Sequence, residues 1–258
     1  DKPNAGSVLQ YNLKDAQIED FGEISLRGHL ISDEKEAQAE LSLNGEVQKL
    51  AGWPNGEYTG LIKPIDSNEY GKRTKSGIAN GCSFKVNYDR PSQWSKPEQA
   101  WLSGTIGPNY EFDYYPVSRF DSKEKRVYLS RGALEKYYTE PYYRFENVPE
   151  ELDEPGEYYI DRQSGMLYFY PPEDAPKDSV LTITMSTPTL DVSRKAPNSM
   201  FRIENSKNIV FENLIFKGGR GSAITGKNNS NIKFINCEIN SFGENGIRFD
   251  ASTDITIS

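Results

Sequence analysis

Carboxylates are the only side chains in this sequence whose chemistry and number suit a catalytic role. The chain holds one histidine, His29, with no second histidine to complete a metal site or a triad. It has no Cys-x-x-Cys pair, no phosphate-binding glycine loop and no Gly-x-Ser-x-Gly motif. Hydride transfer, phosphoryl transfer and Ser-His-Asp hydrolysis therefore lack support, and we expect no cofactor. Two carboxylates can cleave a sugar linkage, one protonating the leaving oxygen and the other activating water or attacking carbon.

The last part of the chain positions such groups, because it repeats with a constant step. An Asn-Ile or Asp-Ile motif begins at Asn208, Asn231 and Asp254, so the residue number rises by 23 each time. Apolar and polar residues alternate within each period, as in strands with one buried face. Asn213 and Asn236 lie between such runs, where asparagine suits a sharp corner and can pair with its copy one turn away. Three short strands per period predict a parallel β-helix with about 23 residues per coil.

The same alternation decides which side chains of the repeat point outward. With the apolar residues inward, two rows of outward residues form, and successive members of a row are one step of the repeat apart. The strip made by the two rows contains Arg202, Glu204, Thr225, Lys227, Arg248 and Asp250. Glu204 and Asp250 are two turns apart with Lys227 between them, which disfavours a calcium site, so we expect no metal.

This repeat resembles the right-handed parallel β-helix (pectin-lyase-like) superfamily, the fold of pectin-degrading enzymes and many secreted bacterial polysaccharide enzymes. Residues 208–216, 231–239 and 243–249 carry the resemblance, which covers the chain from about Met200 onward. It implies a fragment of a secreted bacterial β-helix glycoside hydrolase-like protein, located outside the cell or on its surface. The implied partner is a polysaccharide or oligosaccharide. One fold hosts many functions, so the resemblance specifies the fold better than the activity.

The resemblance also suggests where catalysis takes place. In polygalacturonase-type β-helices an Asp-Asp pair directly precedes the strand that corresponds to Gly246-Ile247, and Glu244-Asn245 occupies that place here. This chain departs from the pattern with one carboxylate instead of two, and with Glu instead of Asp. The implied catalytic residues are Glu244 and Asp250, and the implied substrate-binding residues are Arg202, Arg220, Asn245 and Arg248. The alternative is that these residues are surface charges that only keep a sheet soluble.

The residues ahead of the repeat are rich in strand patterns. Asn44-Gly45 predicts a type I′ hairpin, and Gly165 predicts a second hairpin between residues 153–161 and 166–172. The second hairpin is similar to a segment just ahead of the main coils in secreted bacterial β-helix glycosidases. Residues 91–100 suggest one short helix, and residues 180–185 and 189–192 suggest the beginning of the first coil.

The overall expectation is an all-β protein. It comprises a β-rich barrel or sandwich-like inserted domain over residues 1–145, a β-hairpin connector over 146–178, and truncated parallel β-helix coils over 179–258. The repeat breaks off at Ser258, so we expect the remaining coils of the same parent protein as a partner. Cys82 and Cys237 are far apart in sequence, and a free thiol is the expectation for Cys237.

Composition limits the other partners. The 258 residues carry a net charge of −8, which disfavours binding to a nucleic-acid backbone. No apolar run approaches the roughly 20 residues of a membrane span.

Three functions remain open: part of a polysaccharide-degrading glycoside hydrolase, a non-catalytic carbohydrate-binding or cell-surface β-helix, and a polysaccharide lyase. In a lyase, Lys227, Arg202 and Arg248 would supply the base and neutralise a uronate. The sequence does not name the sugar.

Overall fold

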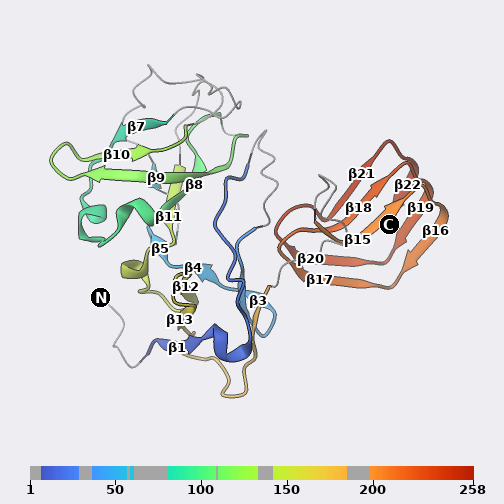
Figure 1. Cartoon of the computed structure of the whole chain (residues 1–258), viewed down its shortest axis with the longest axis horizontal. Helices are drawn as coiled ribbons and strands as arrows, with labels where there is room; N and C mark the ends of the chain where they lie inside the picture. Colours follow the sequence, from blue (N-terminus) through green and yellow to red (C-terminus); the bar gives the residue numbers. More distant parts are fainter. Residues whose placement is uncertain are drawn as a thin grey trace. The chain divides into compact units, whose positions relative to one another are not determined.

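Strands form nearly all of the regular structure of this chain (Figure 1). The computed structural model describes residues 7–28, 37–56, 59–60, 81–108, 110–132, 142–184 and 198–258. His29 and residues 189–192 lie outside these ranges. The chain divides into two compact units, each built from segments distant in sequence. Unit 1 comprises Asp1–Ala16, Leu26–Ser32 and Gln48–Lys177, and unit 2 comprises Gln17–Ser25, Asp33–Val47 and Asp178–Ser258. The all-β class is confirmed, whereas the domain boundaries expected from the sequence stay a prediction.

One sheet of unit 1 is built around the hairpin that Gly165 closes. Its four strands, in spatial order, are β1 (Leu9–Asn12), β13 (Met166–Tyr170), β12 (Glu157–Asp161) and β4 (Lys49–Leu50). The hairpin strands β12 and β13 pair antiparallel, with Asp161 opposite Met166. Gly165 has a φ of 83°, which glycine adopts without strain. The hairpin predicted here is confirmed.

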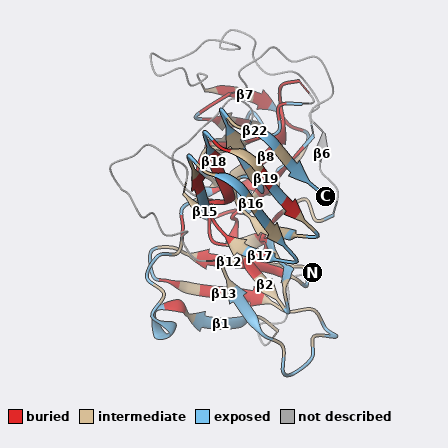
Figure 2. Cartoon of the chain, turned by 90° about the vertical axis from the view of Figure 1, so that its right-hand side faces the viewer, coloured by how far each residue is buried: buried red, intermediate tan, exposed pale blue. Residues whose placement is uncertain are grey.

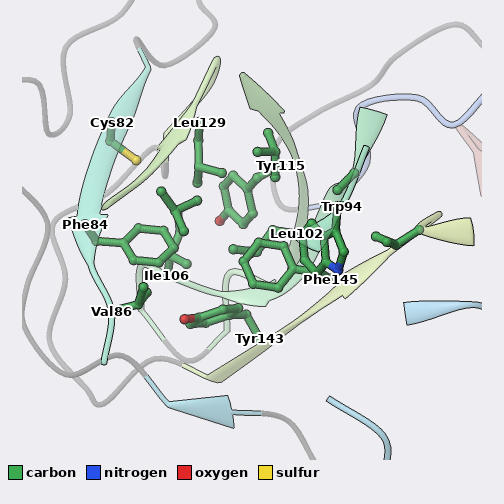
Figure 3. Packing of buried hydrophobic residues seen from close by; sticks show 14 residues of the cluster. Cys82, Phe84, Val86, Trp94, Leu102, Ile106, Tyr115, Leu129, Tyr143 and Phe145 are labelled. Atoms are coloured by element: carbon green, nitrogen blue, oxygen red, sulfur yellow. The ribbon is translucent and has the colours of Figure 1, made fainter. Parts of the chain in front are cut away.

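The larger sheet of unit 1 curls around an aromatic core (Figure 3). Its spatial order is β5 (Gly52–Trp53), β11 (Tyr142–Glu146), β8 (Trp101–Thr105), β9 (Asp113–Asp121), β10 (Arg126–Leu129) and β7 (Cys82–Lys85), with β6 (Thr59–Gly60) also paired to β11. Phe84 of β7 and Tyr143 of β11 come from strands far apart in this order. Their ring centroids are nevertheless only 5.4 Å apart, so the sheet bends back on itself.

Helix is confined to short 3₁₀ turns in the described residues: η1 (Leu13–Ala16), η3 (Arg90–Gln93), η4 (Pro97–Gln99) and η5 (Pro149–Glu151). The single helix expected over residues 91–100 is wrong, because η3 and η4 are separate. Proline disfavours helical backbone in the residue before it, and Lys96, ahead of Pro97, has φ −139° and ψ 68°.

A small antiparallel sheet of unit 2 joins β14 (Leu181–Ile183), β2 (Leu41–Leu43) and β3 (Glu46–Val47). Asn44 and Gly45 link β2 to β3 with φ values of 51° and 89°, so the predicted hairpin is confirmed. The interpretation of residues 180–185 as the first coil is wrong for β14. That strand pairs antiparallel with β2, because an alternating sequence predicts a strand without specifying its partner.

The repeat forms three parallel sheets whose register is the step of 23. The first sheet holds β15 (Ser199–Glu204), β18 (Ser222–Lys227) and β21 (Ile247–Asp250); the second holds β16 (Lys207–Glu212), β19 (Ser230–Ile235) and β22 (Thr253–Ile257); the third holds β17 (Ile215–Gly219) and β20 (Glu238–Phe242). Phe201 lies opposite Ile224, which lies opposite Ile247. The middle strand β18 is almost wholly buried, whereas its neighbours β15 and β21 are mostly exposed or half-buried (Figure 2).

The corners between these strands recur with the same step. Left-handed backbone is found at Asn205, Asn228 and Ala251, at Asn208, Asn231 and Asp254, at Asn213 and Asn236, and at Gly218 and Ser241. The predicted pairing of corner asparagines is confirmed, since the Asn236 amide donates to the Asn213 carbonyl oxygen at 2.6 Å. Inside the stack, Phe211 and Phe234 are parallel, with centroids 4.9 Å apart. Cys82 and Cys237 are both free.

Candidate functional site

The outward face of the sheet β15–β18–β21 carries both predicted rows. Arg202 pairs with Thr225, which pairs with Arg248. Glu204, Lys227 and Asp250 form the second row in the same way. Adjacent strands lie about 4.8 Å apart, so this face presents a charged group every few ångströms along the stack.

Each outer strand of the face holds its own ion pair. Arg202 Nη2 lies 2.8 Å from Glu204 Oε1, and Arg248 Nε lies 3.4 Å from Asp250 Oδ2. Lys227, exposed between the two carboxylates, takes part in no ion pair among the described residues. The cation of Lys227 thus lies between two ion pairs, one on each neighbouring strand.

Thr225 interrupts the first row. Its side chain is buried, and its hydroxyl lies 2.8 Å from that of Ser199, so it is not a free surface group. Between Arg202 and Arg248 the first row therefore has a buried, uncharged side chain. The alternation predicts the direction of this side chain and not its depth.

Glu244 lies at the corner that leads into β21, and the preceding repeat holds it in place. The Ser222 hydroxyl donates to Glu244 Oε2 at 3.1 Å, and the Glu244 amide donates to the Gly221 carbonyl at 3.2 Å. Ser222 is fully buried, and the Asn245 amide N lies 3.4 Å from its oxygen. Our sequence reasoning missed Ser222. Its position one full repeat before Asn245 is the signal that identifies it.

Of the two predicted catalytic carboxylates, Glu244 precedes strand β21 and Asp250 ends it. Asp250 is three residues along β21 from Ile247, or about 10 Å at 3.3 Å per residue, and Glu244 lies three residues earlier still. Asp250 instead shares its row with Glu204, two strands and about 10 Å away between Cα atoms.

Arg220 lies inside unit 2 and not on the outward face. Only 4% of its side chain is exposed, and both terminal nitrogens of the guanidinium bind the carboxylate of Asp20. Arg220 is therefore unsuited to bind substrate, because its guanidinium is buried and already paired with a carboxylate.

Two carboxylates of unit 1, Glu157 and Glu146, are largely withdrawn from solvent. Burial raises the pKa of Glu157 to about 7, although the amides of Glu154 and Asp153 and the Arg144 guanidinium favour the charged form. Burial likewise raises the pKa of Glu146, which accepts a 2.6 Å hydrogen bond from Ser103. Both carboxyl groups are held by hydrogen bonds within unit 1. In the described part of the chain, no three metal-binding side chains gather into a possible ion site. No helix in that part is long and apolar enough to span a membrane.

Comparison with known proteins gives one relevant likeness. No protein-family model matches the chain, and no curated protein matches it. A solved structure named "Glycoside hydrolase" is similar, with a TM-score of 0.54 and 12% sequence identity. The match covers 81% of this chain and 43% of that one, so this chain spans less than half of the length of that protein. At this identity the likeness shows a related fold and assigns no activity.

Proposed function

We propose that this chain is part of a secreted or cell-surface polysaccharide-degrading glycoside hydrolase, and that its three parallel sheets are the faces of a right-handed parallel β-helix. The observation that carries the proposal is the register of 23. It aligns charged side chains of three successive repeats on one outward face, which suits a chain of repeating sugars. The similar solved structure, named as a glycoside hydrolase, supports a carbohydrate ligand.

In the proposed reaction, carboxylates on and beside this face provide acid–base catalysis. Glu244 acts as general acid or base at the corner of β21, and Asp250 acts from the end of the same strand. Arg202, Arg248 and Asn245 are exposed and bind sugar hydroxyls or acidic groups. Glu204 joins this set because it lies in the row of Asp250 on the same outward face.

A polysaccharide lyase is the second candidate, favoured by Lys227. This exposed amine has no ion-pair partner among the described residues and has an arginine on each neighbouring strand. A lyase needs a base to remove a proton and cations to neutralise a uronate. Lys227, Arg202 and Arg248 supply these groups.

The test is turnover of defined polysaccharides, both neutral and uronate-containing, by the chain and by Glu244→Gln, Asp250→Asn and Glu204→Gln variants. A hydrolase releases new reducing ends without near-ultraviolet absorbance, whereas a lyase leaves an unsaturated, absorbing sugar. Loss of a general acid or base lowers kcat about 100-fold or more. Glu212→Gln is the matched control, because Glu212 is an exposed carboxylate on β16, in another sheet.

Each outcome separates the functions. Full activity of Glu244→Gln removes Glu244 from the mechanism. If the parent chain forms an absorbing product and Lys227→Ala does not, the chain is a lyase and the hydrolase proposal is wrong. Binding without turnover, measured by calorimetry on the same polysaccharides, favours a carbohydrate-binding role.

A further inference from the structure

Two short segments of unit 2 pack against the corner that carries Glu244. Arg220 and Gly243 are equivalent positions one repeat apart, at the ends of β17 and β20. The Arg220 carbonyl accepts a hydrogen bond from the Ala37 amide at 3.0 Å, and the Gly243 amide donates to the Gly219 carbonyl at 2.9 Å. The segment that begins at Ala37 is therefore fixed to the first of these two corners by a backbone hydrogen bond.

An ion pair between the buried Arg220 guanidinium and the exposed Asp20 carboxylate fastens a second segment to the same corner. The guanidinium of Arg220 is 4% exposed, and its Nη1 donates to Asp20 Oδ1 at 3.1 Å while its Nη2 bonds to Asp20 Oδ2. The Gly22 amide donates to Asp20 Oδ1 at 3.0 Å, which fixes the carboxylate. A planar guanidinium bound at two nitrogens restrains direction as well as distance.

Two glycines make room for these contacts. A Cβ at Gly243 would overlap the Cβ of Ala37 and lie 2.5 Å from the Arg220 carbonyl oxygen. Gly22 has a φ of 64°, and a Cβ there would overlap the Arg220 guanidinium. The next repeat therefore has glycine in place of arginine because the Ala37 segment occupies that volume.

Ser222 connects this arrangement to Glu244. It lies two residues after Arg220, is fully buried, and donates to Glu244 Oε2 at 3.1 Å. We propose that the Asp20–Arg220 pair, here called the clasp, and Ser222 are positioning residues that hold the Glu244 carboxyl in one orientation. This inference rests on the proposed role of Glu244 in glycan cleavage.

The clasp is tested without any substrate, by amide hydrogen exchange of the whole chain. In Asp20→Asn the buried guanidinium loses its charged partner, and we expect the amides of Gly243 and Glu244 to exchange about tenfold faster. The amide of Phe234, in the middle of β19, should keep its rate. Asp178→Asn is the matched control, because Asp178 is an exposed carboxylate of unit 2 outside the clasp. Unchanged exchange at Gly243 and Glu244 in Asp20→Asn overturns the clasp.

Positioning is tested by kinetics on the polysaccharide that the chain turns over. Ser222→Ala should lower kcat about tenfold with KM unchanged and should shift one limb of the pH–rate profile, because the carboxyl loses a hydrogen-bond donor. Ser252→Ala is the matched control, since its hydroxyl accepts a 3.0 Å hydrogen bond from the Asn229 amide, away from Glu244.

The two proposals fail differently. An unchanged kcat and pH profile in Ser222→Ala, with Glu244→Gln inactive, overturns positioning and leaves the proposed function standing. A fully active Glu244→Gln overturns the proposed function and with it the positioning role. In either case, the exchange rates in Asp20→Asn show whether the Asp20–Arg220 pair stabilises the corner at Gly243 and Glu244.

Discussion

At the scale of single residues, glycine occurs where a neighbouring residue fills the volume that a side chain would occupy. The inward row Ile203, Gly226 and Phe249 shows this within the stack. A Cβ at Gly226 would overlap the ring of Phe249, so the small residue in the middle repeat allows the large one in the next. Gly243 and Ala37 have the same relation at the corner before Glu244.

Gly243→Ala tests this packing. The added methyl group has no free volume, because it meets a side chain and a backbone oxygen. We expect a loss of about 1–3 kcal/mol in the free energy of unfolding, measured by urea titration followed by circular dichroism. Gly246→Ala is the control, since the nearest atom to its Cβ, in Ile239, is 3.7 Å away. Its stability should stay within about 0.5 kcal/mol of the parent. Equal stability of the two variants would contradict the packing argument.

At the scale of elements, the corners keep the strands of successive repeats in register. Asparagine is used there for two reasons. It tolerates left-handed backbone, and its amide reaches the same residue of the next repeat. The Asn205–Asn228, Asn208–Asn231 and Asn213–Asn236 pairs have hydrogen bonds of 3.3, 2.8 and 2.6 Å.

Substitutions at Asn236 separate these two reasons. Asn236→Gly keeps an easy left-handed backbone and loses the 2.6 Å hydrogen bond, so we expect a cost of about 1 kcal/mol. Asn236→Ala also forces alanine into φ near 49°, which adds about 1–2 kcal/mol. Urea midpoints should therefore rank parent above glycine above alanine. A glycine variant that is less stable than the alanine variant would show that the backbone angle is not limiting.

At the scale of the whole molecule, each unit contains a carboxyl with a shifted pKa, and the two shifts have opposite directions. Burial raises the pKa of Glu157 in unit 1 to about 7, so its protonated form favours the folded state. This stabilisation is complete below the unfolded pKa of about 4.3 and is lost as the pH rises to about 7. In unit 2, burial by itself would raise the pKa of Asp20. Hydrogen bonds from Arg220 and Gly22 lower this pKa by more, so the net change is a decrease. The contribution of Asp20 is present above about pH 3.9 and is lost as the pH falls.

Tryptophan fluorescence can follow unit 1 alone, because Trp53, Trp94 and Trp101 all belong to it. We expect its urea midpoint to fall between pH 5 and pH 7.5 as Glu157 ionises. Glu157→Gln should weaken this pH dependence, although above about pH 7 it also lowers stability, because Arg144 loses its charged partner there. A parent midpoint that stays constant or rises over that range would contradict the raised pKa.

The sequence alone determined the features that depend on neighbouring residues or on a fixed period. Asn44-Gly45 and Gly165 identified their hairpins, because a left-handed backbone is a local requirement. The step of 23 identified the register of three parallel sheets and both rows of the outward face, because alternation fixes the direction of every side chain in a strand.

Only the tertiary structure decided what packs against those elements. Asp20 lies 200 residues from Arg220, and no local pattern connects them, so an arginine expected to bind substrate is instead buried in an ion pair. Strand β14 has the alternation of a repeat strand and pairs with β2 in a different sheet. The separation of Glu244 from Asp250 follows from the extended backbone of β21, which lies between them. The period of the repeat specifies the direction in which a side chain points. Long-range packing specifies which residues it contacts, how deeply it is buried and how far apart two residues lie.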